Sequence, residues 1–331
     1  MTVAVTAGDP CGIGPELILK TLPVLRPHRA IIIGDLPVFA RAARVLKHPL
    51  PGWRVVRKLT GVLDTAGLVF LDCASRGTFA PGHPTPAAGA AALRYLDHAA
   101  ALAQQQVVSA VVTAPVTKWA IERSGVHFEG QTEYLARALR ARDPVMMFVS
   151  EALRVVLLTR HLPLSDVPRR VDRRLIRITL QRTVDALRRQ FKIRQPRVAV
   201  CGLNPHAGEA GLFGDEERRV LLPALAALRR RGVRCEGPFA SDTLFARLTG
   251  TAWGRETFDA VVCWYHDQGL IPFKMAAGDR GCQLTLGLPV VRTSPDHGSA
   301  LDIAGRGVAD PGSMRYALTL ALQLACLRDA C

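Results

Sequence analysis

Short apolar runs alternate with longer amphipathic stretches along most of the chain. The runs have the length of buried strands, and the stretches between them repeat apolar positions at helical spacing. Strands that alternate with helices indicate a mainly parallel sheet, or two such sheets, and so an α/β fold. The runs predict strands at Thr2–Val5, Ala30–Gly34, Val108–Val112, Pro144–Val149, Leu153–Leu158, Arg197–Leu203, Ala260–Trp264 and Gln283–Leu286.

Three histidines stand just beyond predicted strands: His161, His206 and His266. Strand ends of an α/β sheet converge on one cleft, so three imidazoles there can reach one ion. Imidazole suits Zn²⁺, Co²⁺ and related divalent ions, and three protein ligands leave a coordination position open for substrate. On spacing alone, separate loop or core histidines stay an open alternative.

A glycine-containing loop, Gly8 to Gly14, joins the first strand to a helix that begins near Pro15. Backbone N–H groups of such a loop can hold an anion. Neither a Walker sequence nor GxGxxG is present. A structural turn and a ligand loop therefore both stay open.

Length and composition narrow the class of protein. The chain has 331 residues, 49% hydrophobic and 21% charged, which is typical of a globular protein of two domains. No stretch approaches the length of a membrane span, and no signal-peptide pattern precedes Gly8. We expect a cytoplasmic protein whose scattered cysteines are free thiols.

The net charge of +15 raises the question of nucleic-acid or membrane binding. The arginines are spread along predicted helices, and no nucleic-acid-binding module is recognisable. We interpret the charge as solvated helix faces that also attract phosphorylated metabolites. We expect neither nucleic acid nor membrane as a partner.

The most specific motifs lie between Val261 and Asp310, where the chain contains YHDQG, TLGLP, RTS-x-DHG and AGRG. This stretch resembles the C-terminal half of the 4-hydroxythreonine-4-phosphate dehydrogenases, the PdxA family of vitamin B6 synthesis. HGSALDIAGRGVADP also resembles the NAD-binding loop of isopropylmalate and isocitrate dehydrogenases. The resemblance implies a two-domain α/β/α fold like that of isopropylmalate dehydrogenase, with an interdomain cleft. The first domain would comprise residues 1–128 and 298–331, and the second, residues 129–297, would carry the metal and dimer contacts.

The activity implied by the resemblance is NAD-dependent, metal-dependent oxidation of 4-phosphooxy-L-threonine at its C3 hydroxyl. The resulting β-keto acid would lose CO₂ and give 3-amino-2-oxopropyl phosphate for pyridoxal phosphate biosynthesis. In the family, motifs matching RHLPL, LNPHAGE and YHDQG each supply one ligand of a divalent metal (zinc, magnesium or cobalt), which implies these roles for His161, His206 and His266. The family's ligands come from both subunits, which implies a homodimer with a shared metal site.

The resemblance also implies a set of substrate-binding residues: Gln131, Thr132, Lys274, Gln283 and Arg292. A phosphate dianion needs cationic donors and hydroxyl groups around it. Gln131 stands where the family has His, and Gln283 where it has Asn. Gln131 cannot titrate and Gln283 is one methylene longer, so the exact substrate stays open. Thr132 alternatively caps the helix that follows it.

Four residues match the NAD loop of the wider dehydrogenases: Gly298, Ser299, Asp302 and Ile303. An acidic residue there suits the ribose hydroxyls of NAD over the 2′-phosphate of NADP. The motifs do not identify the base that takes the substrate proton. Asp242 and Asp267 are the candidates, with helix capping and orientation of a metal ligand as their alternative roles.

Other functions stay open at this point. A paralogue would oxidise D-threonate or D-erythronate 4-phosphate, or an aromatic cis-dihydrodiol from terephthalate. The dihydrodiol needs no phosphate clamp, so the presence of Thr132, Lys274 and Arg292 counts against it. A protein of another class would bind a phosphorylated metabolite without catalysis.

Overall fold

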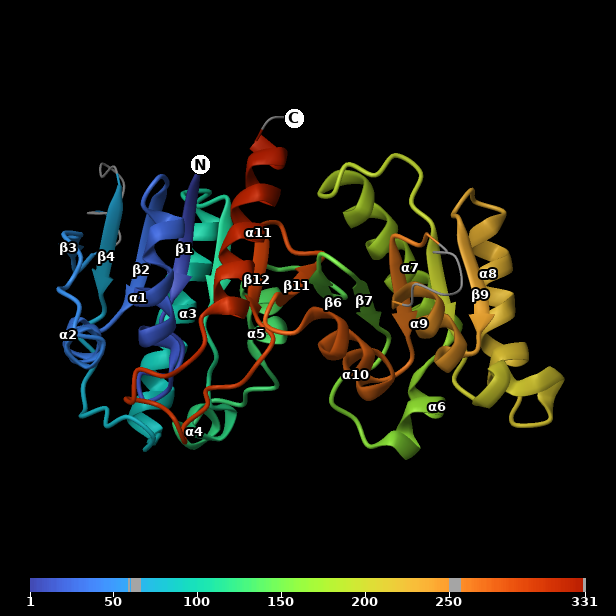
Figure 1. Ribbon diagram of the computed structural model, residues 1–331, viewed down its shortest axis with the longest axis horizontal. Coiled ribbons are helices and arrows are strands. Elements are labelled where there is room, and N and C mark those ends of the chain that lie inside the picture. Colours follow the sequence, from blue (N-terminus) through green and yellow to red (C-terminus); the bar gives the residue numbers. More distant parts are fainter. Residues whose placement is uncertain (59, 61–66, 250–256, 330–331) are drawn as a thin grey trace. The chain divides into compact units, whose positions relative to one another are not determined.

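A computed structural model describes residues 1–58, 60, 67–249 and 257–329 of the chain (Figure 1). The chain forms two compact units: unit 1 comprises Met1–Pro144 and Cys282–Cys331, and unit 2 comprises Val145–Gly281. These boundaries differ from those expected at 128/129 and 297/298. Helix α5 (Gln131–Ala138) packs on α3 (Pro86–Gln104), and strand β12 (Val291–Pro295) pairs with β5 (Ala110–Thr113), so both segments belong to unit 1.

The sheet of unit 1 has the strand order β3-β4-β2-β1-β5-β12-β11. Its other strands are β1 (Thr2–Thr6), β2 (Arg29–Gly34), β3 (Arg54–Val56), β4 (Leu68–Asp72) and β11 (Gly281–Leu286). Neighbouring strands are parallel except β11 and β12, which are antiparallel. Strands β1, β5, β11 and β12 are buried along their whole length, as is typical of strands covered on both faces.

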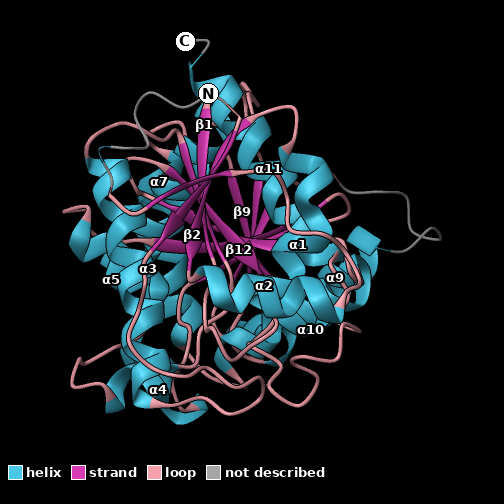
Figure 2. Cartoon of the chain, turned by 90° about the vertical axis from the view of Figure 1, so that its left-hand side faces the viewer, coloured by secondary structure: helices cyan, strands magenta, loops and turns pink. Residues whose placement is uncertain are grey.

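Helices cover the faces of this sheet (Figure 2). They include α1 (Gly14–Leu25), α2 (Leu36–Val45), α4 (Lys118–Arg123) and α11 (Gly312–Asp329). Helix α1 packs against α2 and α11, whereas α3 packs against α4 and α5. In Figure 2, α3 and α5 lie on one side of the strands and α1 and α2 on the other. None of the described helices has both the length and the apolar character needed to cross a membrane.

The strands of unit 2 follow the order β6-β7-β10-β8-β9. The strands are β6 (Val145–Ser150), β7 (Arg154–Leu157), β8 (Val198–Cys201), β9 (Cys235–Phe239) and β10 (Ala260–Cys263). Only β6 and β7 pair antiparallel, and the other pairs are parallel. The helices are α6 (Val167–Arg170), α7 (Arg173–Arg189), α8 (Leu222–Arg229), α9 (Ser241–Thr249) and α10 (His266–Ala277). The elements of both units match the predicted alternation of strands and helices and confirm the predicted α/β class.

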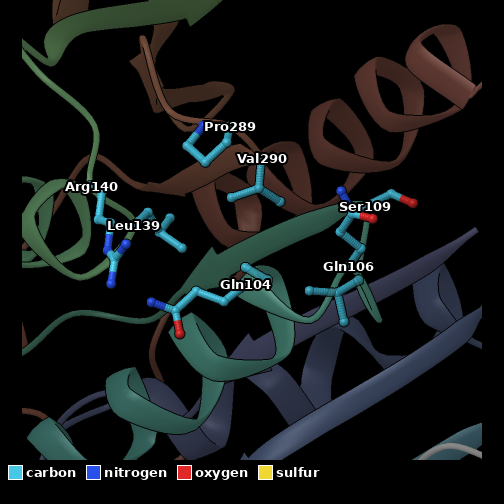
Figure 3. Close-up of a pocket in the computed structure, with 9 residues that line it drawn as sticks. Gln104, Gln106, Ser109, Leu139, Arg140, Pro289 and Val290 are labelled. Atoms are coloured by element: carbon cyan, nitrogen blue, oxygen red, sulfur yellow. The ribbon is translucent and has the colours of Figure 1, made fainter.

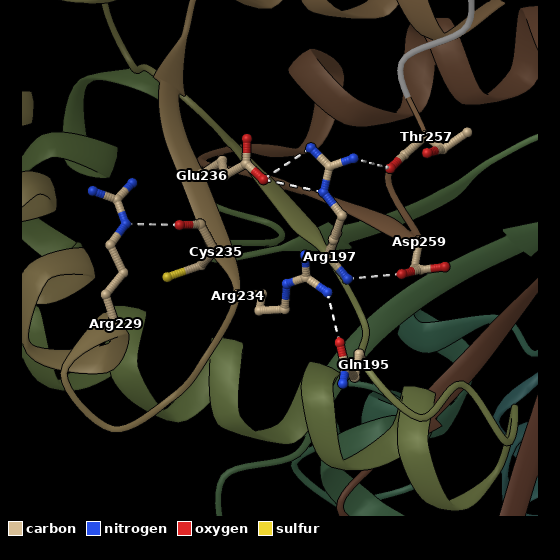
Figure 4. A network of polar contacts seen from close by, with 8 residues as sticks. All are labelled: Gln195, Arg197, Arg229, Arg234, Cys235, Glu236, Thr257 and Asp259. Atoms are coloured by element: carbon tan, nitrogen blue, oxygen red, sulfur yellow. Dashed lines mark hydrogen bonds and ion pairs between the residues drawn. The ribbon is translucent and has the colours of Figure 1, made fainter.

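A network of polar contacts aligns the starts of three strands in unit 2 (Figure 4). Arg197, just before β8, donates from Nε and Nη2 to Oε1 of Glu236 in β9, at 3.1 and 3.0 Å. The backbone N–H of Arg197 donates to Oδ2 of Asp259, just before β10, at 2.7 Å. The guanidinium also lies over the ring of Phe258, 4.7 Å from its centroid. The opposite ends of β8 and β10 lead to His206 and His266, so this network sets where those histidines emerge.

In unit 1, helices α3 and α4 approach each other at Gly89. A Cβ placed on Gly89 would lie 2.1 Å from the carbonyl oxygen of Ala120, far inside van der Waals contact. Because this neighbour is backbone, it cannot rotate away. Glycine is therefore required here by packing, although it weakens an isolated helix.

We predict that Gly89→Ala lowers the stability of the protein. Helix propensity alone predicts a gain of about 1 kcal/mol, but overpacking against backbone costs up to about 3 kcal/mol, so a net loss of about 2 kcal/mol is expected. The neighbouring exposed change Ala90→Gly is the control and should cost only about 1 kcal/mol. Thermal unfolding measures both variants, and a higher melting temperature for Gly89→Ala would contradict the packing argument.

Candidate active site

Arg292 is the most deeply buried cation of the predicted site, with 2% of its surface exposed. It lies on β12, between β5 and β11 in the sheet of unit 1. Its Nη2 donates to Oγ1 of Thr113 on β5 at 2.6 Å. Its Nη1 donates to Oε1 of Gln283 and, at 3.1 Å, to Oγ1 of Thr285, both on β11. The strand that holds Arg292 was not predicted, because its short run of Val290 and Val291 is followed at once by polar residues.

Thr132 completes the ring of acceptors around Arg292. Its Oγ1 lies 3.3 Å from Nη1 of the arginine. Helix α5 begins at Gln131 and is preceded by Gly130, so Thr132 lies inside the first turn and is buried. The capping role considered for Thr132 is therefore wrong, since its hydroxyl faces a guanidinium and not the free N–H groups of the helix end.

The electrostatic setting of Arg292 is unusual. Burial lowers the pKa of its guanidinium to about 10, and the carboxylate of Glu133 acts in the opposite direction. Within the part of the chain that the structure describes, no carboxylate forms an ion pair with Arg292. Buried charges in proteins are normally paired, because desolvation of an ion is costly. A guanidinium held only by hydroxyls and one amide is suited to receive an anion.

Gln131 and Gln283 differ in what their head groups contact. Oε1 of Gln283 accepts from Arg292 and, at 3.0 Å, from Oγ of Ser294, while Nε2 donates to Thr285 at 2.9 Å. Gln131 donates from Nε2 to the carbonyl oxygen of Ala114 at 3.2 Å. Of the predicted substrate residues, unit 1 thus brings together Gln131, Thr132, Gln283 and Arg292. Lys274 is exposed on α10 of unit 2.

The histidines predicted as metal ligands all belong to unit 2. The rings of His161 and His266 are neighbours, with centroids 5.8 Å apart. Nδ1 of His266 and Oδ1 of Asp267 are 2.7 Å apart, which leaves Nε2 of His266 directed away from this contact. A carboxylate on the second nitrogen is the usual partner of a metal-bound imidazole. Among the described residues, no group of three or more His, Cys, Asp or Glu side chains is placed to hold an ion.

His206 begins a run of left-handed backbone that ends at Ala210. Non-glycine residues in this conformation cost roughly 1–2 kcal/mol each, so other contacts must hold them. Glu217, 3% exposed, accepts from the backbone N–H groups of Leu203 and Asn204 at 2.8 Å each. Its Oε2 also accepts from Nδ2 of Asn204 at 3.0 Å. Glu217 therefore anchors the loop that presents His206.

A cavity of about 610 Å³ in unit 2 collects three of the predicted residues. Its lining includes His206, Asp242 and Asp267, together with Tyr265 and Gln268. Asp242 is in the first turn of α9 and exposed, and Asp267 is in the first turn of α10 and exposed. Both candidate bases therefore face the same space as one candidate metal ligand.

The predicted NAD loop belongs to unit 1 and is held by α1. The backbone N–H of Ile13 donates to the carbonyl of Ser299 at 3.1 Å, and that of Gly305 donates to Oε1 of Glu16 at 2.6 Å. Nζ of Lys20 donates to the carbonyls of Gly307 and Ala309, at 2.8 and 2.6 Å. Of the matched residues, Gly298 and Asp302 are exposed, and Ser299 and Ile303 are half-buried. An exposed loop on a rigid support suits a ligand that lies along the backbone.

The N-terminal glycine loop packs against this predicted NAD loop. A Cβ on Gly12 would lie 3.0 Å from both Cβ and the carbonyl oxygen of Ser299, so a larger residue would require Ser299 to shift by a few tenths of an ångström. Asp9 is 1% exposed, and burial raises the pKa of its carboxyl. Oγ1 of Thr117 lies 3.0 Å from Oγ of Ser299. The two loops thus form one structural element, which neither motif indicated by itself.

A second cavity, of about 630 Å³ in unit 1, contains none of the predicted residues (Figure 3). Gln104, Gln106, Arg140 and Val290 are among the side chains that line it. The network around Arg292 and the cavity near His206 are the better candidates, because they concentrate the buried cation, the histidines and the acids.

Sequence reasoning missed Thr113, Thr285, Asn204 and Glu217. Thr285 had a usable signal, because residues two apart on a strand share a face and Gln283 was already singled out. Glu217 had no such signal. Its role depends on a hydrogen bond from the backbone of Asn204, thirteen residues earlier in the chain.

Comparison with known proteins identifies the family. The family model described as "Pyridoxal phosphate biosynthetic protein PdxA" matches residues 26–321. A 4-hydroxythreonine-4-phosphate dehydrogenase of Desulforapulum autotrophicum is 41% identical over 99% of this chain and 96% of the relative. A D-threonate 4-phosphate dehydrogenase of Cupriavidus necator is also 41% identical, over 98% of both chains.

Solved structures agree with these relatives. The crystal structure of a 4-hydroxythreonine-4-phosphate dehydrogenase from Klebsiella pneumoniae covers 98% of both chains with a TM-score of 0.84 and 35% identity. An isocitrate dehydrogenase from Methylococcus capsulatus, 16% identical with a TM-score of 0.51, has a similar fold. The resemblance drawn from the motifs is thereby confirmed. Since the family model spans most of the chain and its relatives are named dehydrogenases, this protein belongs to the PdxA family.

Proposed function

We propose that this protein is an NAD-dependent, metal-dependent 4-hydroxythreonine-4-phosphate dehydrogenase. It would oxidise the C3 hydroxyl of 4-phosphooxy-L-threonine, and the β-keto acid formed would lose CO₂ to give 3-amino-2-oxopropyl phosphate. The names of its relatives support the substrate class. The observation that carries the proposal is Arg292, a buried guanidinium that contacts no carboxylate among the described residues and is ringed by hydroxyl groups.

The chemistry of each side chain suggests its role in the proposed reaction. Arg292, with Thr132 beside it, would hold an oxyanion of the substrate, and Lys274 is the further cation that the family resemblance assigns to the substrate. When bound, a divalent ion would act as a Lewis acid on the substrate hydroxyl and NAD would accept the hydride. Imidazole donors on His161, His206 and His266 suit such an ion.

Two aspartates of unit 2, Asp267 and Asp242, would position a metal ligand and accept the substrate proton. Asp267 holds His266 through Nδ1, which selects Nε2 as the nitrogen available for a ligand. Asp242 lines the same cavity as His206 and carries no such contact to a histidine among the described residues, which makes it the better placed base. On the exposed loop of unit 1, Asp302 would accept hydrogen bonds from the ribose of NAD.

A homodimer would complete the metal site. The described residues of one chain bring His161 and His266 together but supply no group of three ligands. Helix α10, which begins at His266, exposes Ile271 and Met275 one turn apart, by 60% and 83%. Large apolar side chains this exposed on one helix face are typical of a surface that another subunit covers.

A paralogous activity is the second candidate. The Cupriavidus necator relative, a D-threonate 4-phosphate dehydrogenase, is as similar as the first relative described. Gln131 and Gln283 differ from the family pattern at two substrate positions. Oxidation of a phosphorylated hydroxy acid without an amino group would use the same residues.

The proposal predicts chelator-sensitive turnover. Purified protein with NAD⁺ and 4-phosphooxy-L-threonine should form NADH, followed by its absorbance, and a chelator should stop the reaction. His206→Ala should lose bound metal, measured by elemental analysis, together with activity, whereas exposed His48→Ala should lose neither. Full activity and metal content in His206→Ala would remove the ligand assignment. Turnover of D-threonate 4-phosphate alone would favour the paralogue.

Arg292→Lys should lower kcat/KM for the phosphorylated substrate by roughly 10²-fold, because an ammonium cannot replace the planar donors that contact three threonines and the anion. Exposed Arg315→Lys on α11 is the control and should leave kcat/KM unchanged. Steady-state kinetics on both variants is the measurement. A tenfold or smaller effect at Arg292 would mean that the anion is held elsewhere.

Met275→Asp should weaken the proposed dimer, because it buries a charge without a partner. Sedimentation velocity should find monomer at concentrations where the unaltered protein is dimeric. Leu50→Asp, at an apolar residue of unit 1 that is 38% exposed, should leave the assembly intact. If Met275→Asp sediments as the unaltered protein does, α10 is not in the interface.

A further inference from the structure

The guanidinium of Arg292 is occupied on one edge and open on the other. Nη1 is used by Gln283 and Thr285, and one N–H of Nη2 is used by Thr113. Nε is buried and has no hydrogen-bond partner among the residues that the structure describes. A guanidinium has five N–H groups, and the pair formed by Nε and the remaining N–H of Nη2 is the edge that binds an oxyanion through two parallel hydrogen bonds.

Gln131 presents an acceptor without a donor at the same site. Its Nε2 donates to the carbonyl oxygen of Ala114, and a carbonyl can only accept, so the amide cannot be turned around. Oε1 therefore points the other way, where it is buried and no described residue forms a hydrogen bond with it. Gln131 adjoins Thr132 and contacts Ala114, which follows Thr113, and both threonines contact Arg292, so the open acceptor lies beside the network that holds the guanidinium.

An ordinary phosphate-binding site offers donors only. Here a bare oxyanion would satisfy the edge of Arg292 but would place its lone pairs against Oε1 of Gln131. Gln283 does not relieve this conflict, because both atoms of its amide are already used by Arg292, Ser294 and Thr285. A ligand that satisfies every open position must bring a donor of its own.

We propose that Gln131 and Arg292 together select an oxyanion that carries an adjacent O–H group. The O⁻ pairs with Nε and Nη2 of Arg292, and the O–H donates to Oε1 of Gln131. This inference rests on the proposed function, since it concerns the same substrate site. Two parts of a phosphorylated hydroxy acid have this chemistry: a phosphate group that retains one P–OH, and a carboxylate with a hydroxyl on the next carbon.

Two matched pairs of small anions test the inference and separate the two sources. Inorganic phosphate keeps an O–H at neutral pH and sulfate does not, and glycolate has the 2-hydroxyl that acetate lacks. Dissociation constants are measured by calorimetric titration at constant ionic strength. The unaltered protein should prefer the O–H-bearing anion of one pair by about tenfold, the effect of one hydrogen bond to a buried acceptor. Preference within the phosphate pair assigns the site to the phosphate end, and preference within the glycolate pair assigns it to the hydroxy-acid end.

Variants of Gln131 decide whether that residue is responsible. Gln131→Met removes the acceptor at nearly equal volume and should abolish the preference, and Gln131→His, which supplies a donor, should reverse it. Gln104→Met is the control, because Gln104 makes the same kind of bond, from Nε2 to the carbonyl of Ala138 at 2.7 Å, outside the site. Melting temperatures verify that each variant is folded.

Lack of preference in both pairs, or a preference that survives in both Gln131 variants, overturns the inference. Failure of the unaltered protein to bind any of the four anions overturns it as well. The titrations contain neither NAD nor metal, so these outcomes leave the dehydrogenase proposal standing. Conversely, absence of turnover would refute that proposal without changing the anion preference.

Discussion

The burial of one guanidinium without a contacting carboxylate is the constraint around which unit 1 is arranged. Removing Arg292 from water costs several kcal/mol, and a neutral set of acceptors returns only part of it. The acceptors come from β5, β11 and α5, so the charge links three elements that are distant in sequence. Burial lowers its pKa to about 10, which still leaves the group charged at neutral pH. Under the proposed function, an anion of the substrate would be the contacting partner that the described residues do not supply.

In unit 2, the structure has to position the three histidines that are candidate metal ligands. The left-handed run from His206 to Ala210 is unfavourable in itself. The buried carboxylate of Glu217 stabilises it by accepting from successive backbone N–H groups. At the other end of the sheet, Arg197 and its partners align the strands that lead to the same histidines. The hydrogen bonds of Glu217 thus offset part of the strain in the loop that presents His206.

The two departures from the family pattern have unequal consequences. Gln283 is part of the network that orients Arg292, where its Oε1 accepts a hydrogen bond from the guanidinium. Gln131 retains an unused acceptor, because its amide nitrogen is committed to Ala114. A neutral acceptor in place of a titratable ring changes which ligand atoms can face it. Under the proposed selection, substrate choice in this protein would depend on hydrogen-bond polarity more than on charge.

The sequence by itself determined the α/β class, most strands and helices, the family and the residues worth examining, because periodicity and short motifs are local properties. It could not determine that Arg292 lies on a strand between β5 and β11, that Thr132 faces a guanidinium instead of capping α5, or that Glu217 holds the loop of His206. Nor could it place residues 129–144 and 282–297 in unit 1. These features depend on strand order and on contacts between distant segments, which only the packing of the whole chain decides.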